Sequence, residues 1–202
     1  MYWLQHLLAW LSLALLVSPG HAISIQGSVQ SSKVVNIEHT TIVSSRTFED
    51  TRAALEASLP PINTTFSTLL AAGDITGALV ALESLPVLNT FIVPPRNFGN
   101  LLRTRNRTEK AVQYDIGNPY AATLMCSFEM GISLYAPIRV LLREEEGVSM
   151  FEYDRPHSSL GQFRNDRVDE IARDLDRNLT TLLMDAAGWG SKAKVARFSR
   201  QC

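Results

Sequence analysis

Apolar residues recur at spacings of three and four near the C-terminal end of the chain, between Asp166 and Met184. The apolar set is Val168, Ile171, Ala172, Leu175, Leu179, Leu182 and Leu183. This period is typical of an amphipathic helix that packs one face on a core. We therefore predict a helix over residues 166–184 that is ended by Gly188 and Gly190 and forms the main cover of a sheet.

Two earlier segments also predict helices. Thr47 is a candidate N-cap, and acidic residues at positions 49 and 50 suit the positive end of a helix dipole, so one helix should begin here and end before Pro60. A second helical stretch is predicted from about Phe66 to Leu85, with Gly73 and Gly77 as its weak points.

Strand patterns dominate the middle of the chain. We predict strands at about 39–45, 89–93, 111–116, 138–143 and 148–153. The last two flank Glu144–Gly147, which predicts a β-hairpin with a solvated acidic tip and a positive φ at Gly147.

The N-terminal segment predicts export. Residues 1–22 contain an apolar run from Leu7 to Val17, the helix breakers Pro19 and Gly20, and the small residue Ala22 at the expected cleavage position. The alternative is an uncleaved anchor, but the run is shorter than the roughly 20 residues that a membrane span requires. We predict cleavage after Ala22, a secreted chain without a membrane span, and a leader over residues 23–37.

Composition limits the class of protein. The chain has 202 residues, of which 46% are apolar and 19% charged, and its net charge is −1. It is too apolar to be disordered, and the near-neutral balance gives no general attraction to nucleic acid. The length suits a single domain over residues 38–187, followed by a basic tail over 188–202.

Secretion gives a meaning to three sequons and two cysteines. Asn63, Asn106 and Asn178 each begin an Asn-X-Thr sequon and are predicted glycosylation sites. In an oxidising compartment Cys126 and Cys202 are expected to pair. The alternative is a buried free Cys126 and an exposed Cys202 that is able to link two chains.

One block, residues 113–163, combines a strand ending in Gly117-Asn118-Pro119, the segment LYAPIRVLL, a glycine-turned hairpin and the segment FEYDRP. Together with the strand HTTIVSS and a final helix containing Leu175-Asp176, it resembles a secreted, fungal-type member of the family called domain of unknown function 302, over roughly residues 38–186. The resemblance implies an α+β fold with a curved antiparallel sheet, helices packed on one face and a TATA-binding-protein-like arrangement. By analogy of fold, such a sheet and its long helix can hold an apolar ligand between them.

Polar and aromatic side chains lie on or beside the middle strands of this block. The candidate ligand contacts are Tyr114, Asn118, Tyr135, Arg139, Glu152, Tyr153 and His157. The alternative is structural: Asn118 caps a turn, the tyrosines fill the sheet edge, and Arg139 pairs with Glu152 across the hairpin.

Catalytic signatures are weak. Only His39 and His157 remain after signal cleavage, and since a metal site needs several converging ligands, we expect ordinary polar histidines and no metal. The chain contains no GxSxG, GxGxxG or HExxH motif, so no cofactor is expected. The basic stretch of Arg103, Arg105, Arg107 and Lys110 is expected to be a solvated loop, and no nucleic-acid partner is expected.

Three hypotheses follow. The first is a secreted α+β module that binds a small apolar or amphipathic molecule. The second is an enzyme or accessory factor acting on a small organic molecule, for example in a secondary-metabolite pathway, with Tyr114, Arg139, Glu152 or His157 as acid–base candidates. The third is a structural or interaction protein. An apolar cavity favours the first, a cavity with a buried His or Glu the second, and a filled interior the third. These patterns carry no signal of oligomeric state.

Overall fold

The computed structural model describes residues 30–190, and every helix and strand in it belongs to the unit that begins at Val35. The predicted signal peptide and most of the basic tail, including Cys202, lie outside the described residues. The elements run in the order β1 (His39–Val43), α1 (Phe48–Ser58), α2 (Thr65–Ala71), α3 (Ile75–Glu83), β2 (Asn89–Thr90), β3 (Arg96–Asn97), α4 (Phe98–Leu102), η1 (Arg103–Arg105), β4 (Ala111–Gly117), α5 (Pro119–Phe128), η2 (Met130–Tyr135), β5 (Ile138–Glu145), β6 (Val148–Asp154), α6 (Pro156–Leu160), η3 (Gly161–Phe163) and α7 (Asp166–Ala186).

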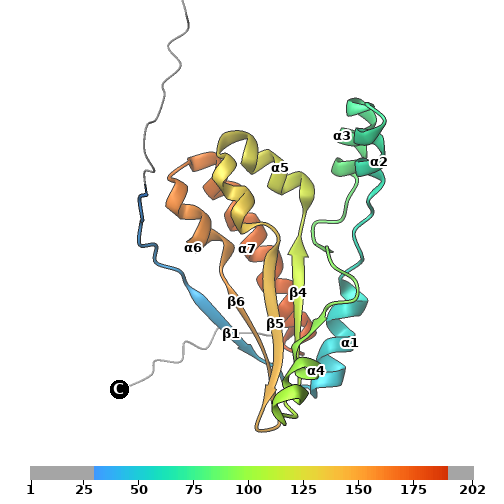
Figure 1. Ribbon diagram of the computed structural model, residues 1–202, viewed down its shortest axis with the longest axis vertical. Helices are drawn as coiled ribbons and strands as arrows, with labels where there is room; N and C mark the ends of the chain where they lie inside the picture. The colour runs from blue at the N-terminus through green and yellow to red at the C-terminus, as the bar shows by residue number, and fades with distance from the viewer. Residues whose placement is uncertain (1–29, 191–202) are drawn as a thin grey trace, which may run out of the picture. The chain divides into compact units, whose positions relative to one another are not determined.

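These strands form one sheet in the order β1-β6-β5-β4-β2, with β3 also paired to β4. Every neighbouring pair is antiparallel. Helices pack on one face of this sheet, and Figure 1 shows α7 running behind the strands. The predicted α+β class, an antiparallel sheet with helices on one face, is therefore confirmed.

Side chains alternate between the two faces of the sheet along each strand, and those on one face form the core. The buried residues of the helix-covered face are Ile42, Val112, Tyr114, Ile116, Val140, Leu142, Phe151 and Tyr153. The facing residues of α7 are Val168, Ala172, Leu175, Leu179 and Leu183, all buried. Asn165 caps α7 by accepting hydrogen bonds from the backbone of residues 167 and 168, so the helix begins where the pattern predicted.

Two predicted elements differ from the structure. The helical stretch of residues 66–85 is two helices, because Gly73 has a φ of +81° and Asp74 starts a new helix by accepting from the backbone of Gly77. The strand predicted at 89–93 is only two residues long, since Pro94 and Pro95 cannot donate to a sheet ladder.

A third element, α5, was not predicted. The structural alternative predicts Asn118 as the cap of a turn, but its side chain accepts from the backbone N–H of Ala121 and begins a helix with Pro119 in the first turn. The β5–β6 hairpin, by contrast, is confirmed. Its turn residues Glu146 and Gly147 have φ values of 51° and 78°, the combination that a tight two-residue hairpin turn requires.

The described helices are also informative about membranes. None of those between residues 30 and 190 combines the length and the apolar character that a bilayer crossing requires.

Candidate functional site

A cavity of about 530 Å³ lies at the end of the sheet where β4 and β6 finish and β5 begins. We call it the sheet-end cavity. Its strand residues are Gln113, Ile116, Gly117, Ile138, Arg139 and Asp154; its helical residues are Ala122, Met125, Ile132, Leu134, Tyr135, Pro156, Ser159, Leu160 and Leu175; Ile37, Phe91, Asn118, Ala136 and Pro137 complete it. In Figure 1 this is the end of the sheet beside α5 and α6.

Most of the lining is apolar. Met125, Ile132 and Leu160 are buried and form part of the hydrophobic core. Leu134, in contrast, is 78% exposed, so apolar surface continues from the lining out to solvent. Among the described residues that line the cavity, Arg139 and Asp154 are the charged ones. Such a lining, with a few polar groups at fixed positions, is typical of a site for a small molecule.

Three of the seven predicted contact residues line the cavity: Asn118, Tyr135 and Arg139. Asn118 is already engaged, because its amide nitrogen also donates to the carbonyl of Pro86 at 3.0 Å. The ring of Tyr135 packs edge-on against that of Phe163, with 5.9 Å between the ring centroids.

The other four predicted contacts do not line it. Tyr114 and Tyr153 do not sit at a sheet edge as the structural alternative predicted; they are buried in the core, because they share a strand face with its apolar residues. The Tyr114 hydroxyl donates to Glu56 Oε1 at 2.9 Å, and that of Tyr153 lies 2.8 Å from Thr180 Oγ1. Burial, and then the Glu56 hydrogen bond, raises the pKa of Tyr114; burial likewise raises the pKa of Tyr153.

Glu152 belongs to a different ion pair from the predicted one. Nε and Nη2 of Arg143 donate to Glu152 Oε1 at 3.0 and 2.8 Å, whereas Arg139 forms no hydrogen bond or ion pair with Glu152 in the described structure. These hydrogen bonds raise the pKa of the Arg143 guanidinium. His157 lies on α6 between two cavity residues, Pro156 and Ser159, but does not line the cavity itself.

A row of charges crosses the face of the sheet opposite the core. His39 Nδ1 lies 2.8 Å from Asp154 Oδ1, and Arg96 Nη2 donates to Asp115 Oδ2 at 2.7 Å. Arg139 stands opposite Asp115 in the β4–β5 register. Within residues 30–190, no carboxylate oxygen lies within the 4.0 Å of an ion pair from Arg139. Its guanidinium therefore remains available at the cavity.

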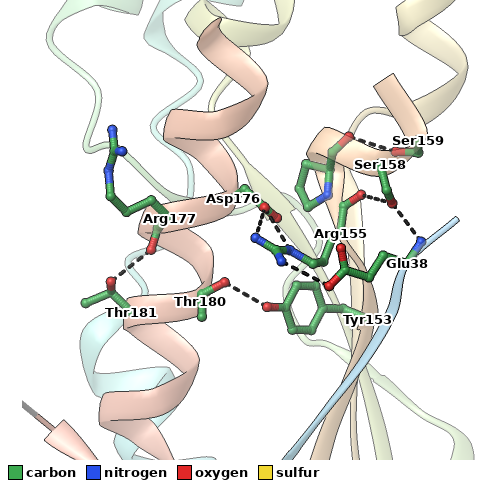
Figure 2. A network of polar contacts seen from close by, with 10 residues as sticks. Glu38, Tyr153, Arg155, Ser158, Ser159, Asp176, Arg177, Thr180 and Thr181 are labelled. Carbon is green, nitrogen blue, oxygen red and sulfur yellow. Dashed lines mark hydrogen bonds and ion pairs between the residues drawn. The ribbon is translucent and has the colours of Figure 1, made fainter. Parts of the chain in front are cut away.

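The most distinctive residues of the sequence resemblance form a structural network (Figure 2). Arg155, from the segment FEYDRP, donates through Nε to Asp176 Oδ2 on α7 at 2.8 Å and through Nη1 to Glu38 Oε1 at 3.0 Å. The Ser158 hydroxyl accepts from the Glu38 backbone at 2.9 Å and donates to the Arg155 carbonyl at 2.8 Å. Arg155 therefore joins the start of β1, the β6–α6 junction and α7, and the pairing with Asp176 raises its pKa.

The basic stretch before β4 is partly neutralised by ion pairs. Lys110 lies 3.1 Å from Glu49 and 3.4 Å from Glu144, and Arg107 pairs with Glu109. The expected solvated loop differs from the structure in part, because Arg103 and Arg105 belong to the short helix η1, whereas Arg107 is exposed and lies outside the helices.

The predicted modification sites are placed as follows. Asn63 and Asn106 are exposed and lie outside the helices, and Asn178 is exposed on α7. Cys126 is half-buried beside the core and has no disulfide partner within the described residues, but Cys202 lies outside them. Glycosylation and the Cys126–Cys202 bridge therefore stay predictions.

Comparison with known proteins supports the resemblance in part. Residues 99–186 match the family model described as domain of unknown function DUF302. A solved structure, the uncharacterized conserved protein DUF302 from Bacillus stearothermophilus, is similar with a TM-score of 0.53 and 16% sequence identity, over 74% of this chain and 97% of that chain. At this identity the likeness concerns the fold alone. A search of curated proteins found no match. The resemblance inferred from sequence is thus confirmed over residues 99–186, which hold all of the sheet-end cavity lining except Ile37 and Phe91.

Proposed function

We propose that this chain is a secreted, fungal-type member of the DUF302 family that binds a small apolar or amphipathic molecule in the sheet-end cavity. The observation that carries the proposal is the cavity itself: about 530 Å³ of space with a mainly apolar lining. Pockets for small molecules usually measure about 300–1,000 Å³. A space of this kind also favours binding over a purely structural role, for which a filled interior was expected.

The same geometry favours binding over catalysis. Acid–base chemistry needs a titratable group within hydrogen-bonding reach of the substrate. Of the four acid–base candidates, only Arg139 lines the cavity, and arginine stays protonated in proteins. The carboxylate that does line the cavity, Asp154, lies 2.8 Å from His39 Nδ1. The Tyr114 phenol is committed to Glu56, and Glu152 is committed to Arg143.

Binding is tested with N-phenyl-1-naphthylamine, a neutral probe whose fluorescence rises in apolar surroundings. The unmodified protein should bind it saturably. Ala122→Phe places a larger side chain in the cavity lining and should weaken binding, whereas Ala53→Phe, at an exposed position of α1, should not. Equal titration curves for the two variants would show that the probe binds elsewhere. Native mass spectrometry of protein purified from its own host should then reveal a co-purified small molecule.

Secretion is supported by the residue pattern of positions 1–22 and by the exposed sequons at Asn63 and Asn106. N-terminal sequencing of protein from the medium should begin at Ile23, and endoglycosidase treatment should lower its mass. Membrane-bound protein that retains Met1 would overturn the cleavage, and an unchanged mass would overturn the glycosylation.

A further inference from the structure

We propose that the ligand of the sheet-end cavity is an amphipathic carboxylate, with its carboxylate bound by the Arg139 guanidinium and its apolar part within the cavity. This inference rests on the proposed function and names the chemical class of the ligand. It follows from a comparison of Arg139 with the other arginines near the sheet and with the other polar groups of the cavity.

Arg139 differs from the other arginines of the described strands. Arg96 is paired with Asp115, and Arg143 is paired with both Glu145 and Glu152. Arg155, just after β6, is paired with Asp176 and Glu38. In the part of the chain from 30 to 190, Arg139 alone among these four has neither a hydrogen-bond acceptor nor an ion-pair partner.

The acidic groups nearest to Arg139 in the sheet already have side-chain partners other than Arg139. Asp115, opposite it in β4, is 4% exposed and accepts from Arg96 at 2.7 Å. Asp154, which also lines the cavity, lies 2.8 Å from His39 Nδ1. Neither of these carboxylates therefore pairs with the Arg139 guanidinium, which is left to bind a ligand anion.

Most of the other polar groups of the cavity form hydrogen bonds within the fold. Gln113 accepts from Arg96, Asn118 contacts the backbone of residues 86 and 121, and the Ser159 hydroxyl donates to the carbonyl of Pro156. Tyr135 has a hydroxyl without a polar partner in the described structure, but a neutral donor does not select for charge. Selection of the ligand's charge thus falls to Arg139.

A carboxylate matches this site better than a phosphate or sulfate does. The guanidinium is a planar fork that donates two parallel hydrogen bonds to one carboxylate. A phosphate dianion calls for more positive charge than one arginine supplies, and no second unpaired cation lines the cavity among the described residues.

The test uses two probes with the same eight-carbon chain, octanoate and octan-1-ol, titrated calorimetrically into the unmodified protein, Arg139→Met and Arg173→Met. Arg173 is exposed on α7 and does not line the cavity, so its variant controls for the loss of one positive charge. A carboxylate is better hydrated than an alcohol, so the affinities of the two probes are not compared directly. The decisive quantity is the loss of affinity for each probe that each variant causes relative to the unmodified protein.

We expect Arg139→Met to weaken octanoate binding about 10- to 100-fold, as for a hydrogen bond between charged groups, and to leave octan-1-ol binding within twofold. Arg173→Met should change neither. Binding of octan-1-ol with no Arg139-dependent preference for octanoate overturns the carboxylate inference and leaves the cavity proposal standing. Binding of neither probe by the unmodified protein overturns both.

Discussion

Replacing Arg155 by methionine tests the network that ties α6, β1 and α7 together. The substitution keeps an unbranched apolar stem but removes the three hydrogen bonds that the guanidinium donates to Asp176 and Glu38. Asp176 is 3% exposed, and its second oxygen, Oδ1, already has no hydrogen-bond partner in the described structure. The variant therefore leaves a buried carboxylate without its counter-charge.

The expected magnitude follows from this burial. Removal of one partner of a buried ion pair costs about 3–5 kcal/mol. The side chain of Arg155 is 38% exposed, so water can reach the site from one side, and we expect a loss near the lower end, about 3 kcal/mol. For a domain of this size such a loss lowers the melting temperature by about 6–12 °C. The Glu38 contact adds little, because that carboxylate is 61% exposed.

Differential scanning calorimetry with two further variants decides the matter. Arg177→Met breaks an exposed pair with Asp174 on the same helix and should cost less than about 1 kcal/mol. The double variant Arg155→Met/Asp176→Leu removes both charges and should be more stable than Arg155→Met alone, because no uncompensated carboxylate remains. Strictly additive losses in the double variant, or equal melting temperatures for Arg155→Met and Arg177→Met, would refute the reasoning.

Three further predictions concern the core, the pH dependence and the cysteines. Leu179→Ala truncates a fully buried side chain of α7 and should lower the free energy of unfolding in urea by about 2–5 kcal/mol; a loss below 1 kcal/mol would mean that α7 is peripheral. Folding raises the pKa of Tyr114, so the protonated phenol contributes to the free energy of unfolding. This contribution is complete below the ordinary tyrosine pKa of 10.0 and is lost as the pH rises above that value. The melting temperature of Tyr114→Phe should then fall less steeply above pH 10 than that of the unmodified protein, and equal slopes would contradict this. Alkylation of the denatured, non-reduced protein should label neither Cys126 nor Cys202; two labelled thiols would exclude any disulfide, and a dimer on a non-reducing gel would favour an intermolecular one.

Periodicity predicted the elements whose patterns are long, and it was weaker where elements are short. The α7 pattern extends over several turns, and the hairpin carries both alternation and a glycine turn, so both were predicted close to their observed bounds. The α5 segment has only ten residues, many of them small, and follows a strand directly, so its period was not recognisable. The cavity residues Ala122 and Met125 on this helix were missed for that reason.

The alternation of side chains along β4 indicates which face of the sheet Tyr114 occupies. Tyr114 has the same parity as Val112 and Ile116, which already assigns its side chain to the core face. The partner of Glu152 was not decided in this way. Glu152 stands opposite Leu141, so Arg139 and Arg143 are both diagonal neighbours on the same face. The structure selects Arg143, and a choice between two diagonals depends on the local twist of the strands, which a residue pattern does not encode.

The motif residues divide into two groups according to whether the fold itself satisfies them. Arg155 and Asn118 donate or accept hydrogen bonds with other parts of the chain, and one oxygen of Asp176, Oδ2, accepts from Arg155, at the junctions of helices and strands beside the cavity. Arg139 has no such engagement within the described residues, although it stands opposite an acidic residue. Because Arg139 forms no ion pair within the described residues, its substitution should leave the melting temperature nearly unchanged while altering ligand choice. Substitution of Arg155 should lower the melting temperature and leave ligand choice nearly unchanged. Measurements of stability and of ligand binding on the same two variants therefore distinguish a residue that stabilises the fold around the cavity from a residue that binds the ligand.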